Sequence, residues 1–140
     1  MNNSSRQRWF SKAILVGVLY LVVGIASSTL AGAAASNQMR SFWRFCAFVI
    51  SGVVFAAHIG YEHFRFRNTA RSTAWHASVA VAFGACALAL AANIHDLGSA
   101  SGYRPRMLIA LVAWPLLTAV PSFIVALVLA AVLGVKRLGV

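Results

Sequence analysis

The chain has 140 residues, of which 61% are hydrophobic and 10% are charged, and its formal net charge is +10. Soluble domains reach only about 45–50% apolar residues and carry about 25% charged ones, so this composition excludes a soluble globular domain. It also excludes a disordered chain, because disorder requires low hydrophobicity and the mean hydropathy here is +0.80. The sequence predicts an integral membrane protein with a single membrane domain over residues 1–140.

Four stretches of the chain contain no Asp, Glu, Lys or Arg, and they cover residues 13–39, 45–61, 72–95 and 107–135. A helix needs about 20 apolar residues to cross a hydrocarbon core about 30 Å thick, and these stretches lack the alternating pattern of a membrane β-barrel. We therefore predict an all-α membrane protein with four transmembrane helices, near 13–35, 42–63, 73–95 and 107–135. The short connections predict antiparallel neighbours in an up-down bundle.

The first of these helices has a second interpretation. Three basic residues precede an apolar core, and the small residues of 31–35 resemble a cleavage site, a combination typical of a secretory signal peptide. Cleavage would remove residues 1–35 and leave three helices. The uncharged stretch continues to Met39, which is long enough for a complete crossing, so we expect a retained helix.

The fourth helix contains Pro115 and Pro121. Each proline removes a backbone donor and clashes with the preceding turn, so we predict a kinked helix. The carbonyls that lose their partners must be met by neighbouring groups, and Thr118 and Ser122 are local candidates. Broken helices mark transporter sites when they occur in two repeated halves, whereas here one helix is affected, which favours a structural kink.

The orientation follows from the positions of Lys and Arg, which are more frequent in cytoplasmic segments. With both termini inside, the cytoplasmic segments hold eight of these residues, namely Arg6, Arg8, Lys12, Arg65, Arg67, Arg71, Lys136 and Arg137. The outer segments hold four, namely Arg40, Arg44, Arg104 and Arg106. We predict a multi-pass protein of the bacterial inner (plasma) membrane with both termini cytoplasmic. Anionic lipid head groups account for the positive charge, and no recognisable module indicates a nucleic-acid partner.

Small residues four positions apart indicate how the helices associate, because membrane helices pack by close approach of their backbones. The candidate packing residues are Gly24, Ser28, Gly32, Gly52, Ala56, Gly60 and Gly84. Such rows in several helices predict a tight bundle, a dimer face, or both.

The scarce ionisable residues define one candidate polar site. His58 and Glu62 are four apart and share a face of the second helix, and Arg65 lies one turn further on. His76 lies one turn into the third helix, which starts from the same side of the membrane. We therefore expect His58, Glu62 and His76 to lie at one depth near the cytoplasmic surface.

This set of side chains fits several chemistries. Two histidines and a glutamate are a ligand set for zinc or non-haem iron, and two facing histidines could ligate a haem. A histidine beside a carboxylate could also relay protons. The simpler interpretation, which we favour from the sequence alone, places the histidines in the head-group layer and pairs Glu62 with Arg65. It requires no cofactor.

The sequence contains no nucleophile elbow, glycine-rich phosphate loop or carboxylate pair, so we do not expect a conventional enzyme. The leading hypothesis is a non-enzymatic accessory or self-associating subunit, with the lipid bilayer and a homo-oligomer or larger membrane complex as partners. The first alternative is a small oligomeric channel or transporter that uses His58, Glu62 and His76. The second is a haem- or metal-binding redox subunit.

Overall fold

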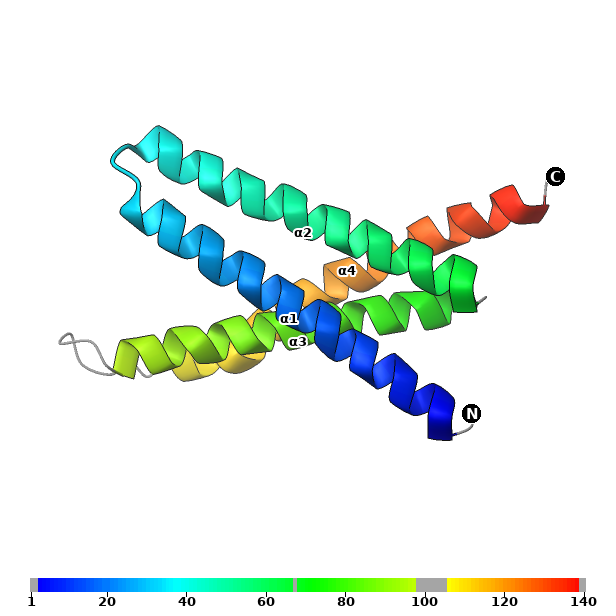
Figure 1. Ribbon diagram of the computed structural model, residues 1–140. Coiled ribbons are helices and arrows are strands. Elements are labelled where there is room, and N and C mark those ends of the chain that lie inside the picture. Colours follow the sequence, from blue (N-terminus) through cyan, green and yellow to red (C-terminus); the bar gives the residue numbers. More distant parts are fainter. Residues whose placement is uncertain (1–2, 67, 98–105, 139–140) are drawn as a thin grey trace.

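The computed structural model describes residues 3–66, 68–97 and 106–138, with side chains for 9–66, 68–95 and 108–134. The described residues form four α-helices and no strands, namely α1 (Asn3–Ala33), α2 (Asn37–Phe66), α3 (Ala70–Leu97) and α4 (Arg106–Leu138) (Figure 1). Each helix contains a segment long and apolar enough to cross a membrane, and these are Trp9–Ala33, Asn37–Phe66, Ala70–His95 and Leu108–Gly134. The prediction of an all-α protein with four candidate membrane helices is confirmed.

The helices begin earlier than the predicted spans because hydroxyl residues cap them in the connections. The backbone N–H of Met39 donates to Ser36 Oγ at 3.2 Å, and that of Ser72 donates to Thr69 Oγ1 at 3.3 Å. Both are bonds from the third helical residue to an N-cap side chain, which satisfies one of the free donors of a helix start. The charged residues that precede the uncharged stretches of the sequence therefore lie inside the helices.

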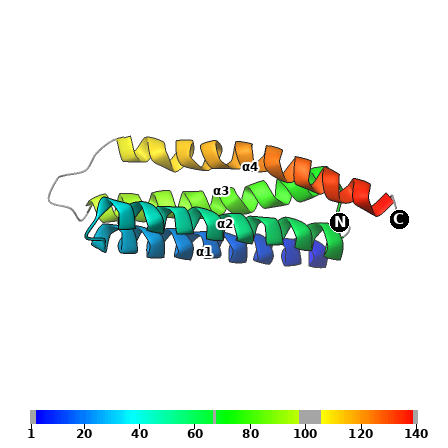
Figure 2. The same ribbon diagram turned by 90° about the horizontal axis from the view of Figure 1, so that it is seen from above.

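The four helices form two antiparallel hairpins that cross each other (Figures 1 and 2). α3 packs most extensively against α4 and next against α1, whereas α2 packs mainly against α1. α1 and α4 make no contact within the described residues. These contacts do not establish the closed up-down bundle that the sequence predicts.

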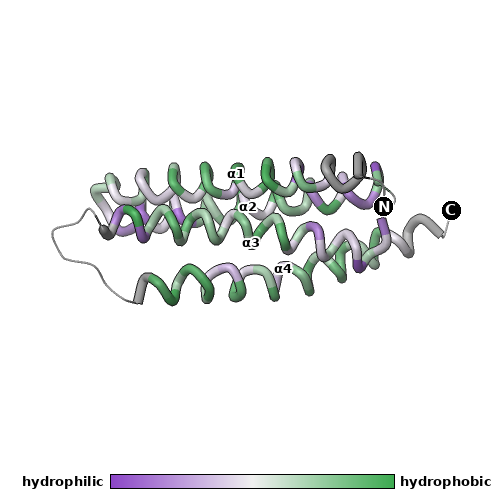
Figure 3. Tube along the Cα trace, turned by 90° about the horizontal axis from the view of Figure 1, so that it is seen from below, coloured by the Kyte–Doolittle hydropathy of each residue, from purple (hydrophilic) through white to green (hydrophobic). Residues whose placement is uncertain are grey.

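The molecule has two ends, which we call the terminal end and the turn end. The terminal end holds the start of α1, the end of α4 and the α2–α3 connection, and the turn end holds the connection between α1 and α2. Hydrophilic residues gather toward both ends, and the middle of the helices is hydrophobic (Figure 3). This distribution matches a protein whose long axis crosses a membrane.

Alanine dominates the contacts between the helices. One buried cluster joins α2, α3 and α4 and consists of Ile59, Ala74, Ala77, Ala126 and Ala130. The other joins α1 to α3 and consists of Ala13, Val16, Tyr20 and Ala80. Small side chains allow the helix backbones to approach closely, and that approach replaces the hydrophobic effect as the source of association in lipid.

The glycines of the predicted packing rows divide into two groups. A Cβ placed on Gly84 would lie 2.7 Å from the Cβ of Tyr20, and one placed on Gly24 would lie 2.6 Å from Leu88 Cδ2. Gly17, which the sequence rows do not include, also lies at this crossing of α1 and α3, with Phe83 Cβ 3.2 Å from its Cβ position. The requirement for glycine is strictest at Gly84, where the added atom would meet the Cβ of Tyr20 and the backbone of Gly17. At Gly24 the added atom would meet only the end of the flexible Leu88 side chain.

The other predicted packing residues do not lie at helix contacts. A Cβ on Gly32, Gly52 or Gly60 would meet no atom within 4 Å, and Ser28 and Ala56 are exposed. These five residues therefore have no close neighbour among the described helices, and their packing at a dimer face stays a prediction. The spacing of small residues identifies faces that permit close approach, but it does not identify the face that a neighbouring helix covers.

α4 is continuous through Pro115 and Pro121, and the predicted kink at these residues stays a prediction. Thr118 Oγ1 donates to the carbonyls of Trp114 and Pro115, at 2.9 and 3.1 Å. Ser122 Oγ donates to the carbonyl of Ala119 at 2.9 Å. A proline in a helix leaves the carbonyl four residues before it without its usual backbone partner. The two hydroxyls do not bond to these carbonyls.

Candidate functional site

The last turns of α2 carry three buried ionisable residues near the terminal end of the molecule. His58, Glu62 and His63 are 7%, 0% and 6% exposed. Their burial follows from the position of Ile59, which packs against alanines of α3 and α4 and turns this face of α2 toward both helices. His58 and Glu62 lie one turn apart on one face, as the sequence spacing predicts.

One carboxylate oxygen of Glu62 is in contact with two polar side chains. Asn68 Nδ2 donates to Glu62 Oε2 at 2.6 Å, and His76 Nδ1 lies 2.9 Å from the same oxygen. The side chain of Glu62 is 1% exposed and that of His76 is 15% exposed. A bond between a carboxylate oxygen and a ring nitrogen requires one proton between them, held by either partner.

Several polar atoms around this pair have no protein hydrogen-bond partner within the described residues. They are Glu62 Oε1, His58 Nε2, both ring nitrogens of His63 and Thr73 Oγ1. Buried polar atoms are nearly always bonded, and each exception requires an explanation. The unbonded atoms of Glu62 and His58 leave hydrogen-bonding capacity beside the bonded pair.

The first turns of α1 cover the site from one side. The ring of Trp9 lies over that of His76, with centroids 4.7 Å apart and planes inclined by 37°. Lys12 Nζ donates to the hydroxyl of Tyr61 and lies 4.1 and 4.5 Å from the ring centroids of Tyr61 and Phe66. An ammonium group over aromatic faces is a favourable electrostatic arrangement, and it places a positive charge beside the last turns of α2.

The structure brings together some of the predicted site residues and not others. Glu62 and His76 are in contact, and His58 is buried one turn before Glu62. Arg65 is exposed and has no ion pair with Glu62 in the described part of the chain. Asn68 occupies the place at the carboxylate that the sequence interpretation assigns to Arg65, so that pairing is wrong.

The candidate metal ligands His58, Glu62 and His76 are not grouped around a common point. Within the side chains that the structure describes, no group of three or more His, Cys, Asp or Glu is placed to hold a metal ion. His76 uses Nδ1 for the bond to Glu62. The geometry therefore favours a carboxylate–imidazole pair over a metal centre built from His58, Glu62 and His76.

Neither family models, curated proteins nor solved structures match this chain. The functional interpretation therefore rests on the geometry of the site.

Three residues of the site are missing from the sequence prediction. Asn68 lies in the connection between α2 and α3, where a polar residue is unremarkable. Trp9 and Lys12 lie at the start of α1, where aromatic and basic residues are typical of a membrane boundary. Their positions depend on how α1 crosses α3, and the sequence carries no signal for that crossing.

Proposed function

We propose that this chain is a small multi-pass inner-membrane protein that binds and releases a proton at Glu62 and His76, as a small channel or transporter with both termini in the cytoplasm. The observation that carries the proposal is the complete burial of Glu62 with one oxygen shared by Asn68 and His76. An ionisable residue inside a membrane protein is by default a functional-site hypothesis.

A purely structural role accounts less well for this pair. A buried ion pair stabilises a fold no better, and often less well, than apolar side chains of similar volume. The surrounding contacts of α2, α3 and α4 are built from alanine and isoleucine, which shows that apolar packing is available at this depth. A titratable pair at such a position is therefore better explained by a requirement to change its protonation state.

The chemistry of the pair is simple. With one proton shared between Glu62 and His76, the pair is neutral overall, either as carboxylate and imidazolium or as carboxylic acid and imidazole. Loss of that proton leaves a buried carboxylate beside a neutral ring. His58 lies one turn away on the same face of α2 with an unbonded Nε2, and it is a candidate to receive or supply the proton.

The proposal is tested in liposomes that contain the purified protein and a pH-sensitive dye. We expect an imposed membrane potential to drive proton uptake by the wild type, and Glu62→Gln to abolish it, because an amide keeps the shape and polarity of the carboxyl group but does not titrate. His95→Ala is the matched control, since His95 is an exposed histidine at the other end of the molecule. Equal proton uptake by Glu62→Gln and wild type would reject the proposal.

A second observation favours self-association, the leading hypothesis from the sequence. Gly52, Ala56 and Gly60 form an uncovered row on α2, because Ala56 is exposed and a Cβ placed on either glycine would meet no atom within 4 Å. A row of this kind allows a second membrane helix to approach closely. We expect Gly52→Leu to lower the proportion of oligomers measured by single-molecule photobleaching in bilayers, with exposed Val53→Leu as the control. An unchanged proportion in Gly52→Leu would contradict this role.

A further inference from the structure

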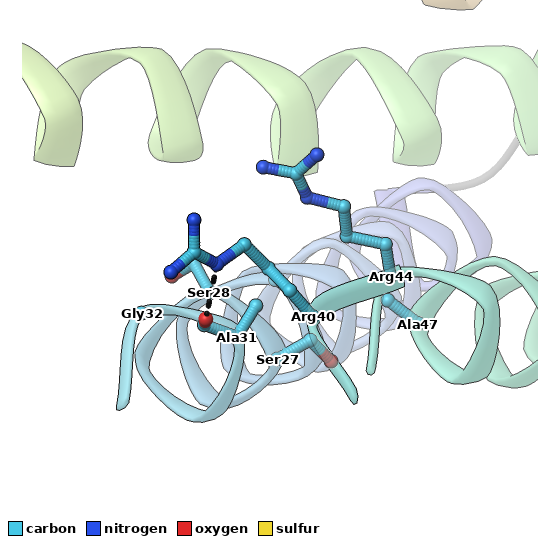
Figure 4. Close-up of a pocket in the computed structure, with 8 residues that line it drawn as sticks. Ser27, Ser28, Ala31, Gly32, Arg40, Arg44 and Ala47 are labelled. Carbon is cyan, nitrogen blue, oxygen red and sulfur yellow. Dashed lines mark hydrogen bonds between the residues drawn. The ribbon is translucent and has the colours of Figure 1, made fainter. Parts of the chain in front are cut away.

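A cavity of about 580 Å³ lies at the turn end of the α1–α2 hairpin, far along α2 from Glu62. Most of the residues that line it are small, and two arginines are the exceptions (Figure 4). The lining residues are Gly24, Ser27, Ser28, Ala31, Gly32, Arg40, Arg44 and Ala47. The small side chains of α1 leave the space, and the two arginines of α2 give it a positive charge.

The two arginines share one face of α2 because they are four residues apart. Arg40 Nε donates to the carbonyl of Ala31 at 3.2 Å, which holds the side chain over the last turns of α1. Arg44 has no hydrogen bond or ion pair within the described residues, and in Figure 4 its side chain projects away from the α1–α2 pair. The guanidinium group of Arg44 and the terminal nitrogens of Arg40 therefore remain free to bind a ligand.

The electrostatics of the cavity favour an anion. The lining contains two guanidinium groups and no carboxylate. The C-terminal end of α1 contributes about half of a negative charge, which holds Arg40 but does not neutralise two positive charges. The hydroxyl of Ser27 adds a polar group to the wall of the cavity.

We propose that this cavity binds a phosphate group through Arg40 and Arg44. A guanidinium group presents a planar fork of donors that matches phosphate oxygens. Arg40 and Arg44 lie close to the end of the α1 span at Ala33 and the start of the α2 span at Asn37. In a protein that crosses the membrane along these helices, this position would be near the level of the lipid phosphates. An anionic phospholipid head group presents this chemistry at the correct level, and a soluble phosphate compound presents the same chemistry from the aqueous side.

The experiment compares the two sources by native mass spectrometry of the detergent-purified protein. One series contains short-chain phosphatidylglycerol and the other contains inorganic phosphate. The test variant is Arg40→Gln/Arg44→Gln. The control is Arg65→Gln/Arg71→Gln, which removes two exposed arginines at the terminal end. Circular dichroism confirms that each variant keeps its helices.

We expect saturable binding of phosphatidylglycerol to the wild type. The affinity of the test variant should be at least about tenfold lower, because each lost bond is charge-assisted. The affinity of the control should be unchanged. Competition by inorganic phosphate at comparable concentration would assign the site to a soluble phosphate, and its absence would assign it to the lipid. Equal affinity in the wild type and the test variant, or no binding of either ligand to the wild type, would overturn the proposal.

Discussion

Nδ1 of His76 lies 2.9 Å from Oε2 of Glu62, and this contact joins α3 to α2 across the most buried polar region that the structure describes. The pair lies beneath the first turns of α1, where Trp9 covers the ring of His76. A change in either residue should therefore affect both the stability of the helix contacts and the chemistry that we propose.

Replacement of Glu62 by alanine should be strongly destabilising. Removal of one partner of a buried pair costs about 3–5 kcal/mol because the other is left uncompensated, and Asn68 also loses its acceptor. We expect His95→Ala, at an exposed site, to change the unfolding free energy by less than about 0.5 kcal/mol. Unfolding in mixed micelles measures both, and equal losses in the two variants would show that the Glu62 contact carries no energy.

A double-mutant cycle separates the pair from its surroundings. We expect the Glu62→Ala/His76→Ala double variant to be more stable than the sum of the single changes implies, with a coupling of about 0.5–3 kcal/mol. The reason is that the second change removes the group left unbonded by the first. Strict additivity would indicate that the two side chains do not interact.

The environment of Glu62 predicts that one substitution, Asn68→Asp, makes the stability of the protein depend on pH. Asn68→Asp would place a second carboxyl group where Asn68 Nδ2 now lies 2.6 Å from Glu62 Oε2. Two carboxylates at this distance repel each other, and protonation of one restores a bond between them. The stability of Asn68→Asp relative to the wild type should therefore rise as the pH falls, whereas that of Asn68→Ala should show no such trend. Thermal unfolding across a pH series measures both.

Replacement of glycine by leucine should give different results at Gly84, which lies at the crossing of α1 and α3, and at Gly52, which lies on an uncovered face of α2. Gly84→Leu should cost about 1–3 kcal/mol, the range for overpacking a tight contact, because a Cβ there would lie 2.7 Å from Tyr20 Cβ. Gly52→Leu should leave the stability of one molecule unchanged, since nothing lies within 4 Å of its Cβ position. Thermal unfolding of both variants in detergent, under conditions that keep the protein monomeric, provides the comparison. Equal losses would contradict the assignment.

The excess of Lys and Arg in the predicted cytoplasmic segments predicts the topology. Reporter fusions after Asn68 and after Val140 should both give cytoplasmic signals, and a fusion near Ser99 should give an outside signal. An outside signal at Val140 would reject the orientation. Mass spectrometry of the mature chain tests separately whether cleavage near Ala35 removes the first helix.

The helices could be predicted from the sequence, but their contacts could not. Four uncharged stretches of sufficient length determine four membrane helices, because the bilayer leaves few other solutions for the backbone. The contacts depend on which face of each helix is covered, and the apolar residues of α1 and α4 do not gather on one face, so no apolar stripe identifies the covered face of these two helices. Small-residue spacing does not identify a covered face either, because Gly84 of α3 and Gly52 of α2 both follow that spacing and only Gly84 has close neighbours.

The candidate site shows the same division. The spacing of His58 and Glu62, with the return of α3 after a short connection, was sufficient to predict that His76 lies near Glu62. The roles of Asn68 and Lys12 were not predictable, because one depends on the conformation of a connection and the other on the crossing of α1 over α3. Local periodicity determines which residues share a helix face, whereas the tertiary arrangement determines what that face meets.

The glycine crossing has a mechanical consequence. α1 and α3 meet near their midpoints at Gly17 and Gly84, and α1 makes no described contact with α4. The two hairpins are therefore joined at this crossing and again toward the terminal end, where Glu62 of α2 contacts His76 of α3. The arginine cavity lies at the opposite end of the α1–α2 hairpin, beyond both of these contacts.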